Sequence, residues 1–320
     1  MSMELSRRKL LAEIAAVGSL SSIAVRGTQA RFQDDVSESA SLQAGTWGLN
    51  GAVAFIQGET LTTARHHEPA ETYGVTDAAV LGAGRPAFGH TYVIPYITSG
   101  GNLELVTHDG TQHSLAAGGT SLPTQKTFPA VGTWNGDEDV FYTASSTIYR
   151  ISPSDSEPTV VKDLGGLNGA KGVLGVSDID EDDTDELVYI GGSGSIRYLN
   201  PAKADDPKIK GTNANNQYGV GAPFQTDNGP RIPYVDGSGN PGFVDVNGNF
   251  TQLATGGVAG KTALAASDVD NDDTPELVFT NSNGELHYLD DLTQQTTPQP
   301  VYDSTGSQIT GIDTNAGILG

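Results

Sequence analysis

A short acidic loop occurs twice in this chain, at Ser177–Glu186 and at Ser267–Glu276. The copies read Ser-Asp-Ile-Asp-Glu-Asp-Asp-Thr-Asp-Glu and Ser-Asp-Val-Asp-Asn-Asp-Asp-Thr-Pro-Glu. With the first Asp as position 1, carboxylates stand at positions 1, 3, 5 and 9 of both copies. A tightly curled loop can direct these side chains and the backbone carbonyl of position 7 at one centre, and such hard oxygen ligands suit calcium. The predicted ligands are Asp178, Asp180, Asp182, Thr184 and Glu186 in the first loop and Asp268, Asp270, Asp272, Thr274 and Glu276 in the second.

The two loops belong to a longer repeat, and this repeat decides the fold. Their first aspartates are 90 residues apart, and a weaker copy at 220–235, which has lost the ligands, lies between them. Earlier copies are marked by residues 131–142, 92–97 and 45–56. The chain from Gly45 onward therefore contains six copies of a unit of roughly 40 to 50 residues.

Each copy has the pattern of four short strands. In the last copy we expect them at 263–267, 277–280, 285–289 and 299–302, because these runs are rich in strand-forming residues and are separated by Gly, Asn and Ser turns. Long stretches with a helical period are missing after the first thirty residues. The sequence therefore predicts an all-β fold, a single β-propeller of six blades with four antiparallel strands in each. A two-layer β-sandwich is the alternative fold, and seven blades is the alternative count.

A ring of blades must close. The segment 309–314, Ile-Thr-Gly-Ile-Asp-Thr, resembles the first strand of one more copy. Because an unpaired strand edge invites aggregation, we expect this C-terminal tail to pair with the N-terminal strands inside the first blade. Either the tail or Gly45–Trp47 would then hold the innermost place.

The motif Asp-x-Asp-x-Asp followed by Glu-Leu-Val, behind a Gly- and Ala-rich strand, resembles the FG-GAP and VCBS repeats, including those of the calcium-bearing blades of integrin α-subunit propellers. Residues 172–200 and 262–290 match this pattern well, and the other four copies match in strand pattern only. The resemblance implies two calcium ions, each clamping one loop between the first and second strands of its blade. The family usually has Gly at loop position 6, where this chain has Asp183 and Asp273. Asp tolerates left-handed backbone better than most residues do, and solvated acidic turns without an ion are the alternative interpretation.

The first thirty residues have the features of an export signal. Ser6–Leu11 is a twin-arginine pattern, and a mostly apolar stretch with a small-residue end at Ala30 follows it. An amphipathic helix is the alternative for this stretch. The expected organisation is a signal segment over 1–30, a flexible linker over 31–44 and the propeller over 45–320. We therefore expect an extracellular or cell-surface protein with no membrane span in the mature chain.

The charge and the missing cysteines restrict the partners. The chain carries 17 basic and 39 acidic residues, for a net charge of -22, which argues against nucleic acid or an anionic membrane as a direct partner. Such an acidic composition also favours a protein from a halophilic source. The chain has no Cys, so disulfides and thiolate metal sites are excluded.

The sequence predicts no catalytic residue. The six His residues form no His-Glu-x-x-His pair, and neither a Gly-x-Ser-x-Gly elbow nor a phosphate-binding Gly-Lys-Ser/Thr motif is present. The preferred function is therefore a calcium-binding module that contacts an extracellular protein or glycan, or has a structural use. The alternative is an extracellular carbohydrate-active enzyme, a lyase or hydrolase, on a calcium-stabilised propeller. Asn249-Phe250-Thr251 also fits the N-glycosylation triplet.

Overall fold

A computed structural model of the chain describes most residues of one compact unit, Gln43–Gly320. The described residues are 52–116, 118, 121–122, 128–134, 136–164, 172–182, 184–191, 194–200, 208–210, 212, 220–226, 228–236, 238–255, 264–272, 274–290, 292, 294–312 and 318–319. The predicted signal segment, the linker and Gly45–Trp47 lie outside them.

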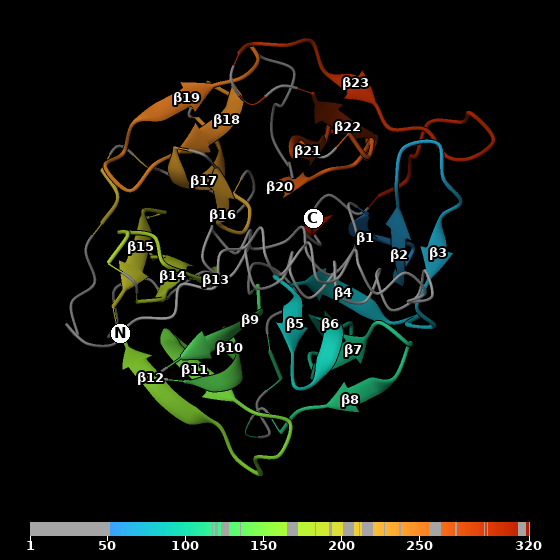
Figure 1. Ribbon diagram of the computed structural model, residues 1–320. Helices are drawn as coiled ribbons and strands as arrows, with labels where there is room; N and C mark the ends of the chain where they lie inside the picture. Colours follow the sequence, from blue (N-terminus) through green and yellow to red (C-terminus); the bar gives the residue numbers. More distant parts are fainter. Residues whose placement is uncertain are drawn as a thin grey trace, which may run out of the picture. The chain divides into compact units, whose positions relative to one another are not determined.

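Six small antiparallel sheets make up this unit, and each corresponds to one copy of the sequence repeat (Figure 1). Blade 1 consists of β24 (Ile318–Leu319), β1 (Val53–Gln57), β2 (Thr60–Ala64) and β3 (Glu71–Thr72). Blade 2 consists of β4 (Ala78–Leu81), β6 (His90–Thr98), β7 (Leu103–Thr107) and β8 (Gln112–Ser114), with β5 (Arg85–Ala87) also paired to β6. Blade 3 consists of β9 (Ala130–Trp134), β10 (Asp137–Ala144), β11 (Thr147–Ile151) and β12 (Thr159–Asp163).

The remaining three sheets follow the same order. Blade 4 consists of β13 (Gly172–Ser177), β14 (Glu186–Ile190) and β15 (Ile196–Leu199), and a single bridge from Arg197 to Lys208 holds the place of a fourth strand. Blade 5 consists of β16 (Phe224–Thr226), β17 (Gly229–Val235), β18 (Pro241–Val244) and β19 (Phe250–Gln252). Blade 6 consists of β20 (Leu264–Ser267), β21 (Glu276–Thr280), β22 (Leu286–Leu289) and β23 (Gln299–Pro300).

The hydrophobic core lies between the blades. Six clusters of buried apolar side chains occur, one for each pair of neighbouring blades. In β14, Leu187 and Tyr189 pack toward blade 3, whereas Val188 and Ile190 pack toward blade 5. A strand buried on both faces reads as a continuous apolar run, which is why the second strands lack alternation. One of these clusters joins blade 6 to blade 1, so the blades form a closed ring.

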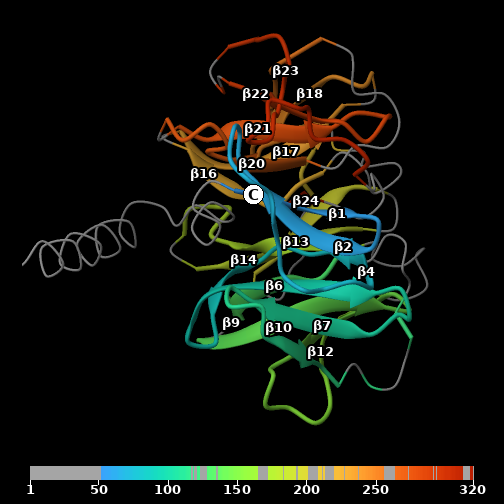
Figure 2. The ribbon, with the colours of Figure 1, turned by 90° about the vertical axis from the view of Figure 1, so that its right-hand side faces the viewer.

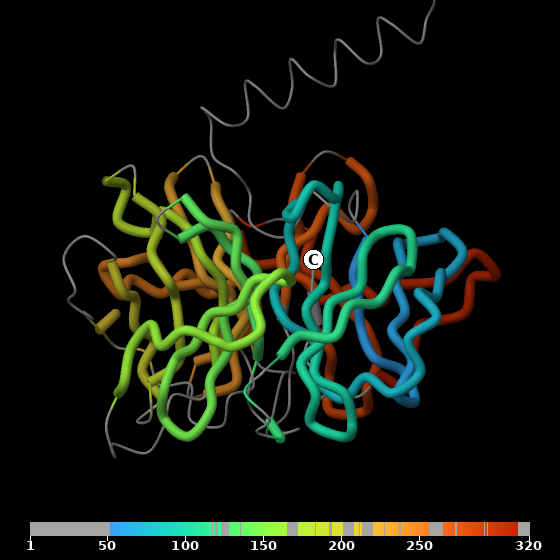
Figure 3. Tube along the Cα trace, turned by 90° about the horizontal axis from the view of Figure 1, so that it is seen from below, coloured from blue at the N-terminus to red at the C-terminus, as the bar shows by residue number. Residues whose placement is uncertain are grey.

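Close approach of the inner strands requires small residues near the axis. A Cβ on Gly132 in β9 would lie 2.2 Å from Cγ2 of Val176 in β13, so a larger side chain would displace the neighbouring blade. Between blades 2 and 3, Ala83 and Ala130 form a parallel bridge. In Figure 2, the blue strands of blade 1 lie between the orange strands of blade 6 and the cyan strands of blade 2. Figure 3 shows the cyan and green tubes of blades 2 and 3 next to each other.

The ring closes in blade 1, as the sequence predicts. Ile318 pairs with Phe55 and Leu319 with Ala54, so the C-terminal strand β24 lies at the inner edge of that sheet. The closing strand itself lies further along the chain than the predicted 309–314, but that segment also contacts blade 1, where Ile312 forms an isolated antiparallel bridge with Gln57 of β1 and the carbonyl of Thr310 accepts from Nε2 of Gln57 at 2.6 Å. Ile309 and Ile312 are also buried in the cluster between blades 6 and 1, and Asp313 and Thr314 lie outside the described residues. The six-blade prediction is confirmed, and the alternatives of seven blades and a β-sandwich are wrong.

The secondary structure of the described residues consists of strands and turns, without a helix. Among them, therefore, no helical segment has the length and apolarity needed to cross a membrane.

Candidate metal centres

Both acidic loops join the first strand of a blade to the second. The first connects β13 to β14 and the second connects β20 to β21, and each begins after a cross-strand pair of Ser with Glu. These pairs are Ser177 with Glu186 and Ser267 with Glu276, and both Glu residues are fully buried. The antiparallel ladder therefore fixes both ends of the loop and holds the position 9 carboxylate inside the protein.

The two loops are wound by the same hydrogen bonds. Oδ1 of the position 1 Asp accepts from the N–H of position 5, at 3.0 Å in the first loop and 2.9 Å in the second. Oδ1 of the position 5 Asp accepts from the N–H of position 7, at 3.1 and 2.9 Å. Oε2 of the position 9 Glu accepts from the N–H of position 2 in both loops. The repeated sequence thus produces a repeated geometry.

The left-handed residue of each loop is at position 4. Glu181 has φ of 60° and Asn271 has φ of 65°. Asn adopts this conformation more readily than most residues with a side chain, so the second loop accommodates it at lower cost. Asp183 and Asp273, at the position where the related repeats usually have Gly, lie outside the described residues.

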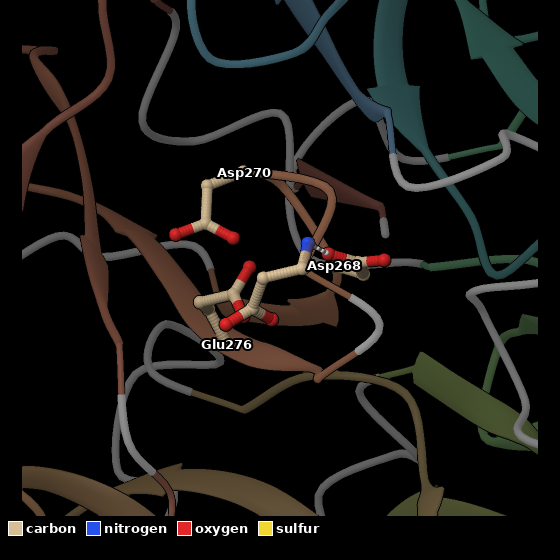
Figure 4. A group of neighbouring side chains, drawn as sticks. Asp268, Asp270 and Glu276 are labelled. Carbon is tan, nitrogen blue, oxygen red and sulfur yellow. Dashed lines mark hydrogen bonds between the residues drawn. The ribbon is translucent and has the colours of Figure 1, made fainter.

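Four carboxylates converge in the second loop. One oxygen from each of Asp268, Asp270, Asp272 and Glu276 lies within 4.8 Å of the others. Figure 4 shows the carboxyl groups of Asp270 and Glu276 pointing toward one another, with Asp268 beside them. Oδ1 of Asp270 and Oε1 of Glu276 are buried and have no hydrogen-bond partner among the described residues. Buried carboxylate oxygens require compensation, and a cation between them would supply it.

Burial, and then the converging charges, raise the pKa of the acids in these loops. Burial, and then the nearby Asp270, raise the pKa of Glu276 to about 9. Burial, and then Asp272, also raise the pKa of Asp270. In the first loop, burial together with Asp180 and Asp182 raises the pKa of Glu186 to about 7. Each loop therefore disfavours its own ionised carboxylates unless a positive charge is added.

The first loop is arranged differently. Its converging set is Asp178, Asp180 and Glu186, with Asp182 outside it. Asn200, which follows β15 and is 1% exposed, donates from Nδ2 to Oε1 of Glu186 at 2.7 Å and to Oδ2 of Asp182 at 3.4 Å. This amide therefore satisfies Oε1 of Glu186, whereas Oε1 of Glu276 in the second loop has no hydrogen-bond partner among the residues that the structure describes.

Each loop also packs into the junction with the next blade. Ile179 of the first loop is fully buried in the cluster between blades 4 and 5, and Nε2 of Gln225 in blade 5 donates to the carbonyl of Asp178 at 3.4 Å. Val269 of the second loop is fully buried in the cluster between blades 6 and 1. Its carbonyl accepts from the N–H of His66 in blade 1 at 2.9 Å. An ion in either loop would therefore stabilise a junction between blades as well as the loop.

The structure thus brings together most of the predicted ligands. Seven of the eight carboxylates lie in the two converging sets, and Asp182 is the exception. The backbone N–H groups of Thr184 and Thr274 bind the position 5 carboxylates, and coordination by their carbonyls stays a prediction. Sequence reasoning missed Asn200. An alignment of the repeats that extends one residue past the third strand would have shown it, because Leu199-Asn200 of blade 4 aligns with Leu289-Asp290 of blade 6.

Blade 3 contains a third buried acid, Asp139, and sequence analysis did not identify its partner, Arg150. Asp139 is 5% exposed, and its Oδ2 accepts from Nη1 of Arg150 on the neighbouring strand at 2.8 Å. Asp137 and Asp139 stand at the start of β10, and Arg150 supplies the positive charge beside both.

Comparisons with known proteins give structural similarity alone. No protein-family profile matches the chain, and no curated protein matches its sequence. Among solved structures, AofleA from Arthrobotrys oligospora is 8% identical with a TM-score of 0.48, covering 78% of this chain and 83% of its own. A protein of unknown function from Bacteroides caccae is 11% identical with a TM-score of 0.41, covering 83% of this chain and 97% of its own. BBS1N, solved in complex with ARL6DN, is 12% identical with a TM-score of 0.47, covering 87% and 91%. Similarity at this level carries no information on function, and the resemblance to FG-GAP and VCBS repeats stays a prediction.

Proposed function

We propose that this chain is a secreted or cell-surface β-propeller that binds calcium in two acidic loops and presents its rim to an extracellular protein or glycan. The observation that carries the proposal is the second loop, where four carboxylates converge and two buried oxygens have no hydrogen-bond partner among the described residues. An arrangement that is costly when empty and compensated when occupied is that of a binding site.

The donor set supports calcium over other common metals. All the side-chain ligands are carboxylate oxygens, whereas zinc favours nitrogen and sulfur. Calcium accepts six to eight oxygens in flexible geometry, which suits an irregular loop that also offers backbone carbonyls. Magnesium requires a tighter octahedron and retains several of its waters.

The burial of these ligands supports a structural ion over a catalytic one. Glu186 and Glu276 are fully buried, and the loops extend into the junctions between blades. The bound ions would stiffen the ring, and the loops of a rigid scaffold are common places for recognition. With a net charge of -22, the surface is suited to a basic protein patch or a neutral glycan.

Calcium binding is tested by thermal unfolding of the full chain with calcium and with a chelator. An ion present at one hundred times its Kd should stabilise the fold by about 2.7 kcal/mol for each site. Asp178→Ala combined with Asp268→Ala should melt like the chelated parent and should not respond to calcium. Glu157→Ala, at an exposed position on blade 3, is the control for loss of surface charge. Equal melting of the parent with and without calcium would refute the proposal.

Recognition is tested separately with a glycan array and a cell-surface pull-down, each with calcium and with chelator. Calcium-dependent capture that the double variant loses is the expected result. Release of reducing ends from a panel of polysaccharides would favour the carbohydrate-active enzyme instead.

A further inference from the structure

A buried carboxylate occurs at the same position in three blades, and its partners differ from blade to blade. The strand registers align the blades, since Val140 pairs with Ile151, Leu187 with Leu199 and Leu277 with Leu289. The acids in question precede the first residue of each pair, and they are Asp139, Glu186 and Glu276. All are buried, with exposures of 5%, 0% and 0%. The position therefore holds a carboxylate whose cost must be offset.

In blade 3 the protein supplies its own cation. The guanidinium of Arg150 lies 2.8 Å from Oδ2 of Asp139 and 3.6 Å from Oδ2 of Asp137. A permanently charged side chain thus occupies the space beside these acids, so blade 3 needs no ion.

In blade 4 the substitute is neutral. Nδ2 of Asn200 donates at 2.7 Å to Glu186 and at 3.4 Å to Asp182, and so joins two of the acids that a cation would join. The amide nitrogen is a donor and has no lone pair to offer a metal. A cation that enters this loop must displace both hydrogen bonds, whether the amide moves away or turns its Oδ1 toward the ion, and the loss of these bonds reduces its affinity.

Among the described residues of blade 6, none plays this part, since Oε1 of Glu276 is buried there without a hydrogen-bond partner. Asp290 stands at the place of Asn200, directly after the third strand, and its exposed carboxylate has no N–H to donate. Accordingly, Asp272 joins the converging set of this loop, whereas its counterpart Asp182 lies outside the set of the first loop. The two loops thus have the same motif but different occupants at one neighbouring position.

Building on the proposed calcium binding, we propose that Asn200 is a built-in replacement for the ion in blade 4, and that the Asn200/Asp290 difference makes the two sites unequal. Blade 6 holds the tight site, and blade 4 holds a weak site that stays folded when empty. Calcium affinity also rises with the number of charged ligands. The blade 6 loop brings four carboxylates together and the blade 4 loop three, so this effect too makes the blade 6 site the tighter one.

Calcium titration calorimetry on single-site proteins tests this proposal. Asp268→Ala leaves the blade 4 site for measurement, and Asp178→Ala leaves the blade 6 site. The blade 6 site should bind about tenfold or more tightly than the blade 4 site. In the blade 4 protein, Asn200→Asp should raise the affinity about tenfold; in the blade 6 protein, Asp290→Asn should lower it by a similar factor.

A further variant separates lost donors from added charge. Asn200→Ser removes the long amide without adding a carboxylate, and it should raise calcium affinity in blade 4 by less than Asn200→Asp does. An Asn200→Asp protein that folds only with calcium would also support the proposal, because the empty loop would then lack its donor.

The results distinguish the two proposals. If neither single-site protein binds calcium, the proposed function fails. If both bind with the same affinity, and neither Asn200→Asp nor Asp290→Asn changes it, calcium binding stands and the inequality is overturned.

Discussion

The N–H of His66 donates a 2.9 Å hydrogen bond to the carbonyl oxygen of Val269, across the junction between the first blade and the last. The N–H of Val269 in turn donates to Oε2 of Glu276, the buried acid of the second loop. One residue thus connects a candidate metal ligand to the junction that closes the ring.

Removal of calcium should loosen that junction before it unfolds the protein. Exchange of the His66 amide hydrogen should accelerate in chelator, because its acceptor belongs to a loop whose acids then repel one another. Hydrogen exchange followed by mass spectrometry or NMR measures the effect. The amide of Val131, which bonds to the carbonyl of Ala83 at the junction of blades 2 and 3, is the internal control. Equal acceleration at both amides would contradict a local role for the ion.

Stability of the calcium-free protein should fall as the pH rises from 4.5 to about 9. The pKa of Glu186 is raised to about 7 and that of Glu276 to about 9, from an ordinary value of 4.5. Below pH 4.5 the folded and unfolded chains are both protonated at these groups. Above it the unfolded chain releases protons that the folded chain retains, so the free energy of unfolding decreases until each folded pKa is passed.

Melting temperature against pH in chelator checks this dependence. Glu276→Gln should flatten the part of the curve between pH 7 and pH 9, where Glu276 alone of the two still titrates. Saturating calcium should remove most of the decline, since the ion replaces the protons. A calcium-free curve that rises across this range would be inconsistent with the buried acids.

Arg150→Ala should destabilise the protein with or without calcium. It leaves the buried carboxylate of Asp139 without its 2.8 Å partner, at a cost of about 1–3 kcal/mol. Glu68→Ala, at the exposed end of the Arg65–Glu68 pair, is the control and should cost about 0–1 kcal/mol. Urea unfolding compares them. Asp139→Asn combined with Arg150→Met should recover part of the loss, and a double variant as unstable as Arg150→Ala would show that the charge pair is not the cause.

Deletion of residues 318–320 should open the ring. The deletion removes both residues of β24 and leaves the inner edge of β1 without its partner strand. An unpaired edge favours association between chains, so the shortened protein should melt lower and form larger species in light scattering. Val160→Ser, on the outer strand of blade 3 where 55% of the side chain is exposed, should change neither property. A monomeric product with the parent melting temperature would show that β24 is dispensable.

The repeat made most of the fold readable from the sequence. The six copies become six blades because strand runs such as 187–190 recur with the same turns, and the ligand register survives because the loops have equal length. The exact closing strand was not readable, since Ile309–Thr314 and Ile318–Leu319 are both short segments with isoleucines, and both contact β1 in the structure. Asn200 was missed for a related reason, because its role depends on cross-strand register and not on its own motif.

The placement of Ile179 and Val269 has a mechanical consequence. These side chains anchor the acidic loops at two of the six junctions, blade 4 with blade 5 and blade 6 with blade 1. The same two junctions mark the ends of an arc made of blades 5 and 6. If calcium binds as proposed, its withdrawal would soften the ring at the junction of blade 6 with blade 1, whereas Asn200 would hold the loop at the junction of blade 4 with blade 5, so this arc would hinge at one end only.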